Sequence, residues 1–232
     1  MSSIAVIGAD GFVGRELRAA FSAAGHAVTP VARAGYEAAR AGAYDVVVNA
    51  AMPSARFRAK TDPAWDFTET VAKTESLVSG WTYKRFIQIS TVSARCQLDT
   101  VYGRHKLAAE SLCPPGSLIA RLGPMYGPAL SKGVLLDMLE GRKVFIDGES
   151  RYSFAPVEFC ARWIAANLAR SGVVEVGSKN TLRLKDVAKH LGAASVFEGP
   201  LDHQDIVSPG ADFPDSSLVL AHLDAARKKA GA

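Results

Sequence analysis

The segment that most constrains the fold is a short apolar run, residues 4–7, followed at once by glycines at positions 8, 11 and 14. An apolar run of this length before a glycine turn is typical of a parallel strand that is covered on both faces. Glycines at this spacing permit a tight turn, let the backbone approach a diphosphate and let the next helix pack on the strand. We therefore expect a strand, turn and helix that open a dinucleotide-binding α/β domain, with an ordinary glycine turn as the alternative.

Strands and helices alternate along the following hundred residues. We expect strands at residues 26–31, 45–49, 85–89 and 118–122, and helices at 14–24, 67–78 and from about 101 to 112. Residues 34–44 leave room for one short helix or a loop. This alternation predicts an α/β fold with a Rossmann-type, doubly wound parallel sheet and right-handed crossovers.

Beyond Gly123 the pattern changes to loops rich in glycine and proline. Helices are expected only near residues 131–140 and 157–169, followed by a weakly structured tail. Gly123 and Pro124 therefore mark a candidate boundary between a cofactor-binding domain, residues 1–122, and a small C-terminal substrate-binding region, residues 123–232. Because that region is short, its coverage of a substrate must be thin or shared with another subunit.

Charge and cysteine content exclude several classes of protein. The 27 basic and 23 acidic residues give a net charge of +4 and are scattered along the chain, which argues against a nucleic-acid partner. The three cysteines form no Cys-x-x-Cys pair, so we expect reduced thiols and no metal site. The N-terminus lacks the pattern of a secretory signal, and no apolar run approaches the roughly 18 residues of a membrane span. A cytoplasmic protein is expected.

A second informative pattern is Tyr102 followed four residues later by Lys106, with Thr91 eleven residues upstream of the tyrosine. Residues four apart share one helical face, so the ammonium can lie near the phenol. A nearby cation favours the phenolate and lowers the tyrosine pKa from about 10 toward the range of proton exchange. A surface tyrosine with a neighbouring lysine is the alternative.

Taken in order, these landmarks resemble the extended short-chain dehydrogenase/reductase superfamily, especially its NAD-dependent epimerase/dehydratase branch of nucleotide-sugar epimerases and ketoreductases. The resemblance extends from Ile4 to about Leu191. It rests on Gly8, Gly11 and Gly14, Asn49 with Ala50 and Ala51, Thr91, Tyr102 with Lys106, Tyr126 with Gly127 and Pro128, and Val157 with Glu158.

The resemblance implies that Tyr102 is the acid/base that exchanges a proton with a hydroxyl or ketone while hydride moves to or from nicotinamide. Lys106 would lower the pKa of the phenol and hold the nicotinamide ribose. Thr91 would hydrogen-bond the reacting oxygen, and Ser90 and Ser93 are neighbours that can share this substrate role. His105 occupies a variable position of the motif, so we expect a solvated helix residue there.

The implied cofactor is NADP or NAD. Arg33 stands at the end of the second strand, where NAD-preferring members usually carry an acid, and an arginine there can pair with the 2′-phosphate of NADP. NADP is therefore expected over NAD, with a solvated loop arginine as the alternative. The expected cofactor contacts are Gly8, Asp10, Gly11, Phe12, Val13, Gly14, Arg33, Asn49, Ala50, Ala51, Tyr102 and Lys106.

Two further arginines are candidate substrate contacts. Arg56, with Arg58 and Lys60, follows the strand at 45–49 in an expected loop at the carboxyl edge of the sheet, where ligands bind in such folds. Arg56 can meet a substrate diphosphate there, although a charged loop is more often only solvated. Arg151 lies one position away from an arginine that relatives place on nucleotide phosphates.

The resemblance implies an NAD(P)-dependent oxidoreductase or epimerase that acts on a nucleotide-linked sugar or a related hydroxyl or ketone compound. A ketoreductase for a non-sugar carbonyl and a non-catalytic NADPH-sensing regulator or assembly factor remain alternatives, and a homodimer is left open. A 4,6-dehydratase is disfavoured, because Val92 and Ser93 follow Thr91 where dehydratases carry Asp and Glu. Relatives also insert a third strand before residue 45 whose end contacts adenine, and this chain has little room for it.

Overall fold

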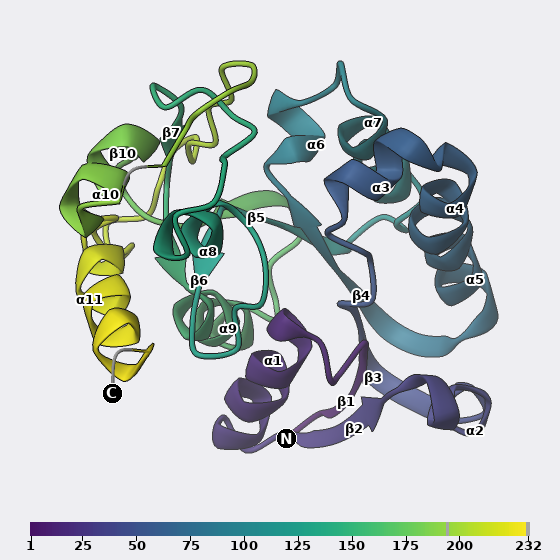
Figure 1. The fold of residues 1–232 in the computed structure, drawn as a ribbon. Coiled ribbons are helices and arrows are strands. Elements are labelled where there is room, and N and C mark those ends of the chain that lie inside the picture. The colour runs from purple at the N-terminus through teal and green to yellow at the C-terminus, as the bar shows by residue number, and fades with distance from the viewer. Residues whose placement is uncertain (194, 231–232) are drawn as a thin grey trace. The chain divides into compact units, whose positions relative to one another are not determined.

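The computed structural model describes residues 1–193 and 195–230, which form two compact units (Figure 1). The first unit contains Met1–Leu122 and Glu158–Val174. The second contains Gly123–Val157 and the chain from Glu175 onward. The chain therefore leaves the first unit at Gly123, returns to it at Glu158 and leaves it again at Glu175.

The first unit is built on a six-stranded sheet in the order β2-β1-β3-β4-β5-β9. Neighbouring strands from β2 to β5 pair in parallel, which confirms the expected doubly wound sheet. The sixth strand, β9, was not expected from the sequence. The strands are β1 (Ser3–Ile7), β2 (Ala27–Val31), β3 (Ala43–Asn49), β4 (Thr82–Thr91), β5 (Leu118–Leu122) and β9 (Gly172–Val176).

Helices cover both faces of this sheet. Figure 1 shows α1 on one side and the group α3, α4, α5 and α7 on the other. The helices and turns of this unit are α1 (Phe12–Ala23), the 3₁₀ turn η1 (Arg33–Gly35), α2 (Tyr36–Arg40), α3 (Arg56–Thr61), α4 (Pro63–Phe67), the π-helical turn η2 (Thr68–Ala72), α5 (Lys73–Gly80), α6 (Ser93–Cys96), α7 (Val101–Ser111) and α9 (Val157–Ala166).

The connection between β2 and β3 contains only η1 and the five-residue α2. No strand intervenes there, and β2 is consequently an edge strand of the sheet. The short connection expected from the sequence is confirmed. The sheet edge at β2 therefore carries only η1 and the short α2.

Two expectations for the segment after β3 were wrong. Residues 56–61 form helix α3 instead of a loop, because they contain no glycine or proline and consist mostly of residues that favour helix. The next helical run begins at Pro63 instead of residue 67. Its start is set by Asp62, whose side chain accepts a hydrogen bond from the Trp65 backbone N–H at 3.1 Å, and by a proline in the first turn.

The core of the first unit consists of the central strands. Ile4, Val47, Val48, Phe86 and Ile87 are all fully or almost fully buried. Continuous burial along a strand requires cover on both faces of the sheet, and this explains why these strands read as apolar runs without alternation. The polar residues that follow each run consequently emerge at the carboxyl edge of the sheet.

The C-terminal part of the second unit contains packed helices, so the expectation of a weakly structured tail was wrong. Leu184, Val187 and Leu191 recur at helical spacing along α10, and their buried face packs in a common apolar cluster with Met138 and Leu223. The unit contains α8 (Val134–Leu139), α10 (Leu184–Leu191) and α11 (Leu218–Ala230), with β6 (Met125–Tyr126) paired to β8 (Ala155–Pro156) and β7 (Arg151–Tyr152) paired to β10 (Leu182–Arg183).

Burial raises the pKa of the thiols of both Cys113 and Cys160 to about 12. They stay protonated near neutral pH, which makes them poor nucleophiles. The part of the chain that the structure describes contains no cluster of three or more His, Cys, Asp or Glu placed to hold a metal ion. In the same part of the chain, each helix is too short or too polar to traverse a lipid bilayer.

Candidate functional site

The turn between β1 and α1 brings three glycines into close contact with neighbouring backbone. Gly8 has φ of +79°, in the left-handed region that favours glycine, and a Cβ there would lie 2.7 Å from the Ala51 Cα. A Cβ on Gly14 would lie 2.1 Å from the carbonyl oxygen of Gly8, and one on Gly11 would lie 3.2 Å from the same oxygen. Side chains at Gly8 and Gly14 would therefore displace backbone, so the glycines keep the turn as a bare backbone cradle.

Helix α1 begins at Phe12 directly after this cradle, and no side chain caps its N-terminus. The first backbone N–H groups of a helix, here those of Phe12 and Val13, have no partner within the helix and carry its positive dipole end. The Asp10 carboxylate is turned to Arg18, whose Nη1 lies 3.1 Å from Oδ1. The bare turn and the uncapped helix start fit the diphosphate of a dinucleotide.

Asn49 holds the facing loop in place. Its side chain is buried and its amide nitrogen donates to Thr74 Oγ1 at 3.3 Å and to Gln88 Oε1 at 3.1 Å. Its Oδ1 accepts from the Ala51 backbone N–H at 3.2 Å. Asn49 thus positions the backbone of Ala50 and Ala51 against Gly8, while its own side chain faces the interior.

Arg33 lies at the same edge of the sheet as the glycine turn. It follows β2, whose last residue, Val31, accepts a hydrogen bond from the Gly8 backbone N–H at 3.0 Å. Its side chain is exposed. From this position the arginine can pair with an anionic group of a dinucleotide that is bound at the turn.

Tyr102 lies at the start of α7, facing the end of β4. Thr100 caps the helix by accepting a hydrogen bond from the Gly103 backbone N–H at 3.0 Å. A Cβ on Gly103 would lie 2.1 Å from the carbonyl oxygen of Gln97, so a glycine here lets α7 pack closely on the segment before it. The Thr91 hydroxyl hydrogen-bonds the buried Tyr102 phenol.

Lys106 is buried on the same face of α7 as Tyr102. Its Nζ lies 5.1 Å from the centroid of the Tyr102 ring and donates to the carbonyl oxygen of Pro53 at 2.8 Å. Burial lowers the pKa of the ammonium to about 7, and the charge of Asp66 opposes that change. The lysine is therefore poised to change its charge near neutral pH.

The expected lowering of the tyrosine pKa is not found. Burial raises the pKa of the Tyr102 phenol above its ordinary value, and the charge of Asp66 adds to this increase. Arg56 and the hydrogen bond from Thr91 act in the opposite direction. Arg56, whose guanidinium carbon lies 5.7 Å from the ring centroid, is a nearby cation that favours the phenolate.

Helix α3 carries Arg56 toward the tyrosine. Its Nη2 donates to the buried Ser93 hydroxyl at 3.1 Å, and Ser93 Oγ lies 3.3 Å from Thr91 Oγ1. Ser93 thereby connects the guanidinium to the hydroxyl that contacts the phenol. Arg58 instead stacks over Trp65, with its guanidinium carbon 3.8 Å from the ring centroid.

The other predicted substrate contact of this unit, Ser90, is bonded within the interior. The Ser90 hydroxyl is buried and donates to Glu110 Oε1 at 2.5 Å, and Glu110 also forms an ion pair with Arg121. That hydroxyl is therefore occupied by a hydrogen bond within the fold. Arg151 is an exposed residue of β7 in the second unit.

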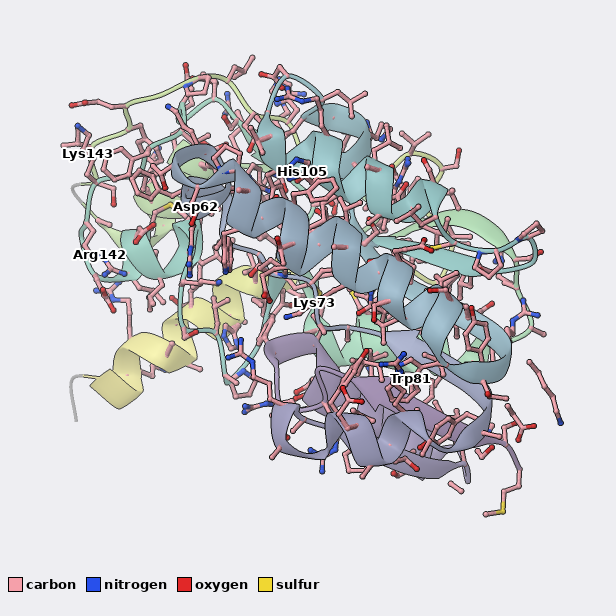
Figure 2. All side chains as sticks on the ribbon, turned by 90° about the vertical axis from the view of Figure 1, so that its right-hand side faces the viewer. Asp62, Lys73, Trp81, His105, Arg142 and Lys143 are labelled. Atoms are coloured by element: carbon pink, nitrogen blue, oxygen red, sulfur yellow. The ribbon has the colours of Figure 1, made fainter. Side chains whose placement is uncertain are left out.

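Two neighbouring residues, Asp66 and His105, differ from the sequence prediction. Asp66 was not predicted at the site, and His105 was expected to be solvated. Asp66 on α4 is completely buried, and its Oδ2 lies 2.8 Å from His105 Nδ1 on α7. His105 is 20% exposed and contacts Asp66, so the expectation of a residue that faces only solvent was wrong. Figure 2 shows the helical run that begins after Asp62 lying alongside the helix that carries His105. The two residues are 39 positions apart, and no local pattern connects them.

The fold is shared with solved structures of low sequence identity. A UDP-glucose 4-epimerase from Thermotoga maritima, solved with UDP-glucose, superposes with a TM-score of 0.76 at 17% identity, covering 98% of this chain and 99% of that one. A dTDP-4-dehydrorhamnose reductase from Bacillus anthracis, in complex with NADP, gives 0.77 at 13% identity, covering 97% and 99%. A UDP-glucuronic acid 4-epimerase from Bacillus cereus, with UDP-glucuronic acid and NAD, gives 0.67 at 19%, covering 94% and 93%. No protein-family model and no curated protein sequence matches the chain.

Proposed function

We propose that this chain is an NAD(P)-dependent oxidoreductase or epimerase of the extended short-chain dehydrogenase/reductase superfamily, acting on a nucleotide-linked sugar or a related hydroxyl or ketone compound. The observation that carries the proposal is that Thr91, Tyr102 and Lys106 meet at one site in the unit that also holds the glycine cradle. Three solved structures that share the fold support the same class of reaction. They were solved with UDP-glucose, with NADP, and with UDP-glucuronic acid and NAD.

The residues that would hold the cofactor are those of the cradle. Gly8, Gly11 and Gly14 leave room for the diphosphate, and the first N–H groups of α1 would bind it. Arg33, exposed beyond β2, would pair with the 2′-phosphate, which favours NADP over NAD. A bound nicotinamide supplies the group that accepts or donates hydride.

Tyr102 would act as the acid/base. With its pKa raised by burial, the free protein keeps a proton on the phenolic oxygen at neutral pH, ready for donation to a ketone oxygen. When a hydroxyl is oxidised, the phenolate must accept its proton. Arg56 and the hydrogen bond from Thr91 favour that phenolate. Thr91 would orient the reacting oxygen, and Lys106 would bind the ribose next to the phenol.

Arg56 is our leading candidate for contact with an anionic group of the substrate. It lies beside Tyr102, and its guanidinium presents several donors in a plane that matches phosphate or carboxylate oxygens. A nucleotide-linked sugar carries such a group in its diphosphate. Arg151, which is exposed on β7, remains a proposed substrate contact.

The test is a turnover screen of the purified protein. We would combine it with NADPH, NADP, NADH or NAD and with UDP- and dTDP-linked sugars, their keto forms and simple non-sugar ketones, following reduced nicotinamide and product. We expect turnover of at least one nucleotide-linked compound and its loss in Tyr102→Phe. Turnover of simple ketones alone would move the assignment to a ketoreductase. Cofactor binding without any turnover would favour the sensor alternative, and absence of cofactor binding would refute the proposal.

A further inference from the structure

Lys106 is a buried cation whose counter-charge is not supplied by its hydrogen-bond partner. The side chain is 3% exposed and donates to the neutral carbonyl oxygen of Pro53. A buried ammonium without an opposite charge nearby is strongly disfavoured relative to its neutral form. The site therefore needs an acid if the lysine is to remain charged when it meets a cofactor or substrate.

Asp66 is placed to be that acid. Its side chain is 0% exposed and lies against the stretch of α7 that carries the lysine, because its Oδ2 is 2.8 Å from Nδ1 of His105, the residue directly before Lys106. Its charge favours the ammonium of Lys106 and disfavours the phenolate of Tyr102. One carboxylate oxygen, Oδ2, faces His105, but the other, Oδ1, has no hydrogen-bond partner. A buried carboxylate oxygen without a partner is costly, and such atoms in native proteins call for an explanation.

His105 joins this buried carboxylate to the protein surface. Its Nδ1 lies 2.8 Å from Asp66 Oδ2, while its ring is partly exposed and stacks edge-to-face on Phe67 at 5.6 Å between centroids. It also stands between Tyr102 and Lys106 in the sequence of α7. The histidine thus holds the acid from one side and meets solvent on the other.

We propose that Asp66 is the counter-charge of the Tyr102–Lys106 site, which favours the charged form of the buried lysine, and that His105 is the positioning residue that holds the Asp66 carboxylate and links it to solvent. This inference deepens the proposed function, and its consequence for catalysis rests on that function. The effect of Asp66 on the charge of Lys106 is a property of the cofactor-free protein and does not depend on it.

The other charged groups around the pair are engaged elsewhere. Asp62, at the start of α4, accepts from the Trp65 backbone N–H, and Glu69 on η2 pairs with Lys73 at the surface. On α7 itself, the exposed Arg104 donates to the backbone oxygens of residues 98 and 99. From α3, Arg56 faces Tyr102 and donates to Ser93.

The decisive experiment is an NMR titration of the Lys106 side chain in the cofactor-free protein, assigned with Lys106→Met. Wild type is compared with Asp66→Asn, and Asp62→Asn is the matched control that neutralises an acid at the start of the same helix. Because Asp66 favours the charged ammonium, D66N should move the titration of Lys106 toward acid by about one pH unit or more. D62N should leave it in place. An unchanged titration in D66N would overturn the proposal.

Two histidine variants keep the proposal testable if D66N does not fold. His105→Asn keeps a hydrogen-bond donor near the position of Nδ1. His105→Ala leaves the buried Asp66 carboxylate without that donor, and the loss destabilises the ionised carboxylate more than the neutral acid. We expect the Lys106 titration to move toward acid in H105A and to stay within a few tenths of a pH unit of wild type in H105N. Equal behaviour of H105A and wild type would overturn the role of the histidine.

Activity measurements separate this proposal from the proposed function. If wild type turns over a substrate, the alkaline limb that reports a charged lysine should move to lower pH in D66N, with cofactor affinity retained. If wild type neither binds cofactor nor turns over, the proposed function fails while the NMR result still decides the role of Asp66. If activity is present but its pH profile is the same in D66N and wild type, the counter-charge has no catalytic role and that part of the inference is wrong.

Discussion

The ammonium nitrogen of Lys106 lies 5.1 Å from the centroid of the Tyr102 ring, and both side chains are buried. Burial acts on the two groups in opposite directions, raising the pKa of the phenol and lowering the pKa of the ammonium to about 7. Both changes favour the neutral forms. In the free protein the pair is therefore closer to a neutral phenol beside a readily deprotonated amine than to a phenolate beside a cation.

Replacing Tyr102 with phenylalanine removes the proposed acid/base but keeps the ring. General acid–base catalysis contributes roughly 10²–10⁴-fold, so kcat should fall by about that factor while cofactor affinity changes little. Tyr83→Phe is the control, because that phenol donates to the Val78 carbonyl oxygen outside the site. Steady-state kinetics with a turned-over substrate make the measurement. Equal losses in both variants would exclude a specific role for Tyr102.

Replacing Arg56 with methionine should raise the pKa of Tyr102 further. The guanidinium favours the phenolate, so its removal moves phenol ionisation, and any pH limb that depends on it, toward alkaline pH. The measurement is an ultraviolet difference titration in which Tyr102→Phe identifies the contribution of the site. Arg58→Met, on the same helix but stacked on Trp65, is the control. A shift toward acid in R56M would contradict the geometry described here.

Replacing Gly14 with alanine should disrupt the cradle. The new Cβ would lie 2.1 Å from the Gly8 carbonyl oxygen, so the turn must move, at a cost of about 1–3 kcal/mol in the free energy of unfolding. Dinucleotide binding should weaken at least tenfold. Gly35→Ala is the control, because nothing lies within 4 Å of a Cβ at that position. Urea unfolding and a cofactor titration of both variants check the prediction, and a G14A protein that binds like G35A would argue against this binding site.

The lowered pKa of Lys106 predicts how stability depends on pH. With a pKa of about 7 in the folded protein and 10.5 as its ordinary value, the unfolded chain binds more protons between these limits. This difference makes the free energy of unfolding increase with pH across that window, by up to roughly 1.4 kcal/mol per unit from this group. The Lys106→Met variant has no ammonium at this site and lacks this pH-dependent term in its free energy of unfolding. The amount by which K106M is more stable than wild type should therefore shrink as pH rises from about 7 toward 10. Urea unfolding of both proteins across this range is the measurement, and parallel curves would contradict the lowered pKa.

Strands β1 to β5, the glycine turn and the α7 motif could be predicted because their signals are local. An apolar run that ends in a glycine turn identifies β1 and the start of α1 without information from the rest of the chain. The same holds for the short connection after β2, which leaves no room for a further strand. The buried face of α10 was also visible in Leu184, Val187 and Leu191, yet the loops around it concealed this periodicity.

The electrostatics of the site could not be predicted in the same way. The effect of Lys106 on Tyr102 was inferred from their spacing alone, but burial dominates the pKa of both groups, and burial is a property of the whole fold. Asp66 and His105 meet across two helices from positions 39 residues apart. Arg56 reaches the phenol only because residues 56–61 are helical.

The most direct test of the account is calorimetric titration of the purified protein with NADPH and NADH side by side, repeated with Arg33→Ala and with Arg40→Ala as a control on the neighbouring α2. A charge-assisted hydrogen bond contributes about 1.5–3 kcal/mol, so we expect NADPH to bind at least about tenfold more tightly than NADH. R33A should remove that preference and R40A should retain it. If neither dinucleotide binds to wild type, the cradle does not hold a cofactor and the central claim is wrong.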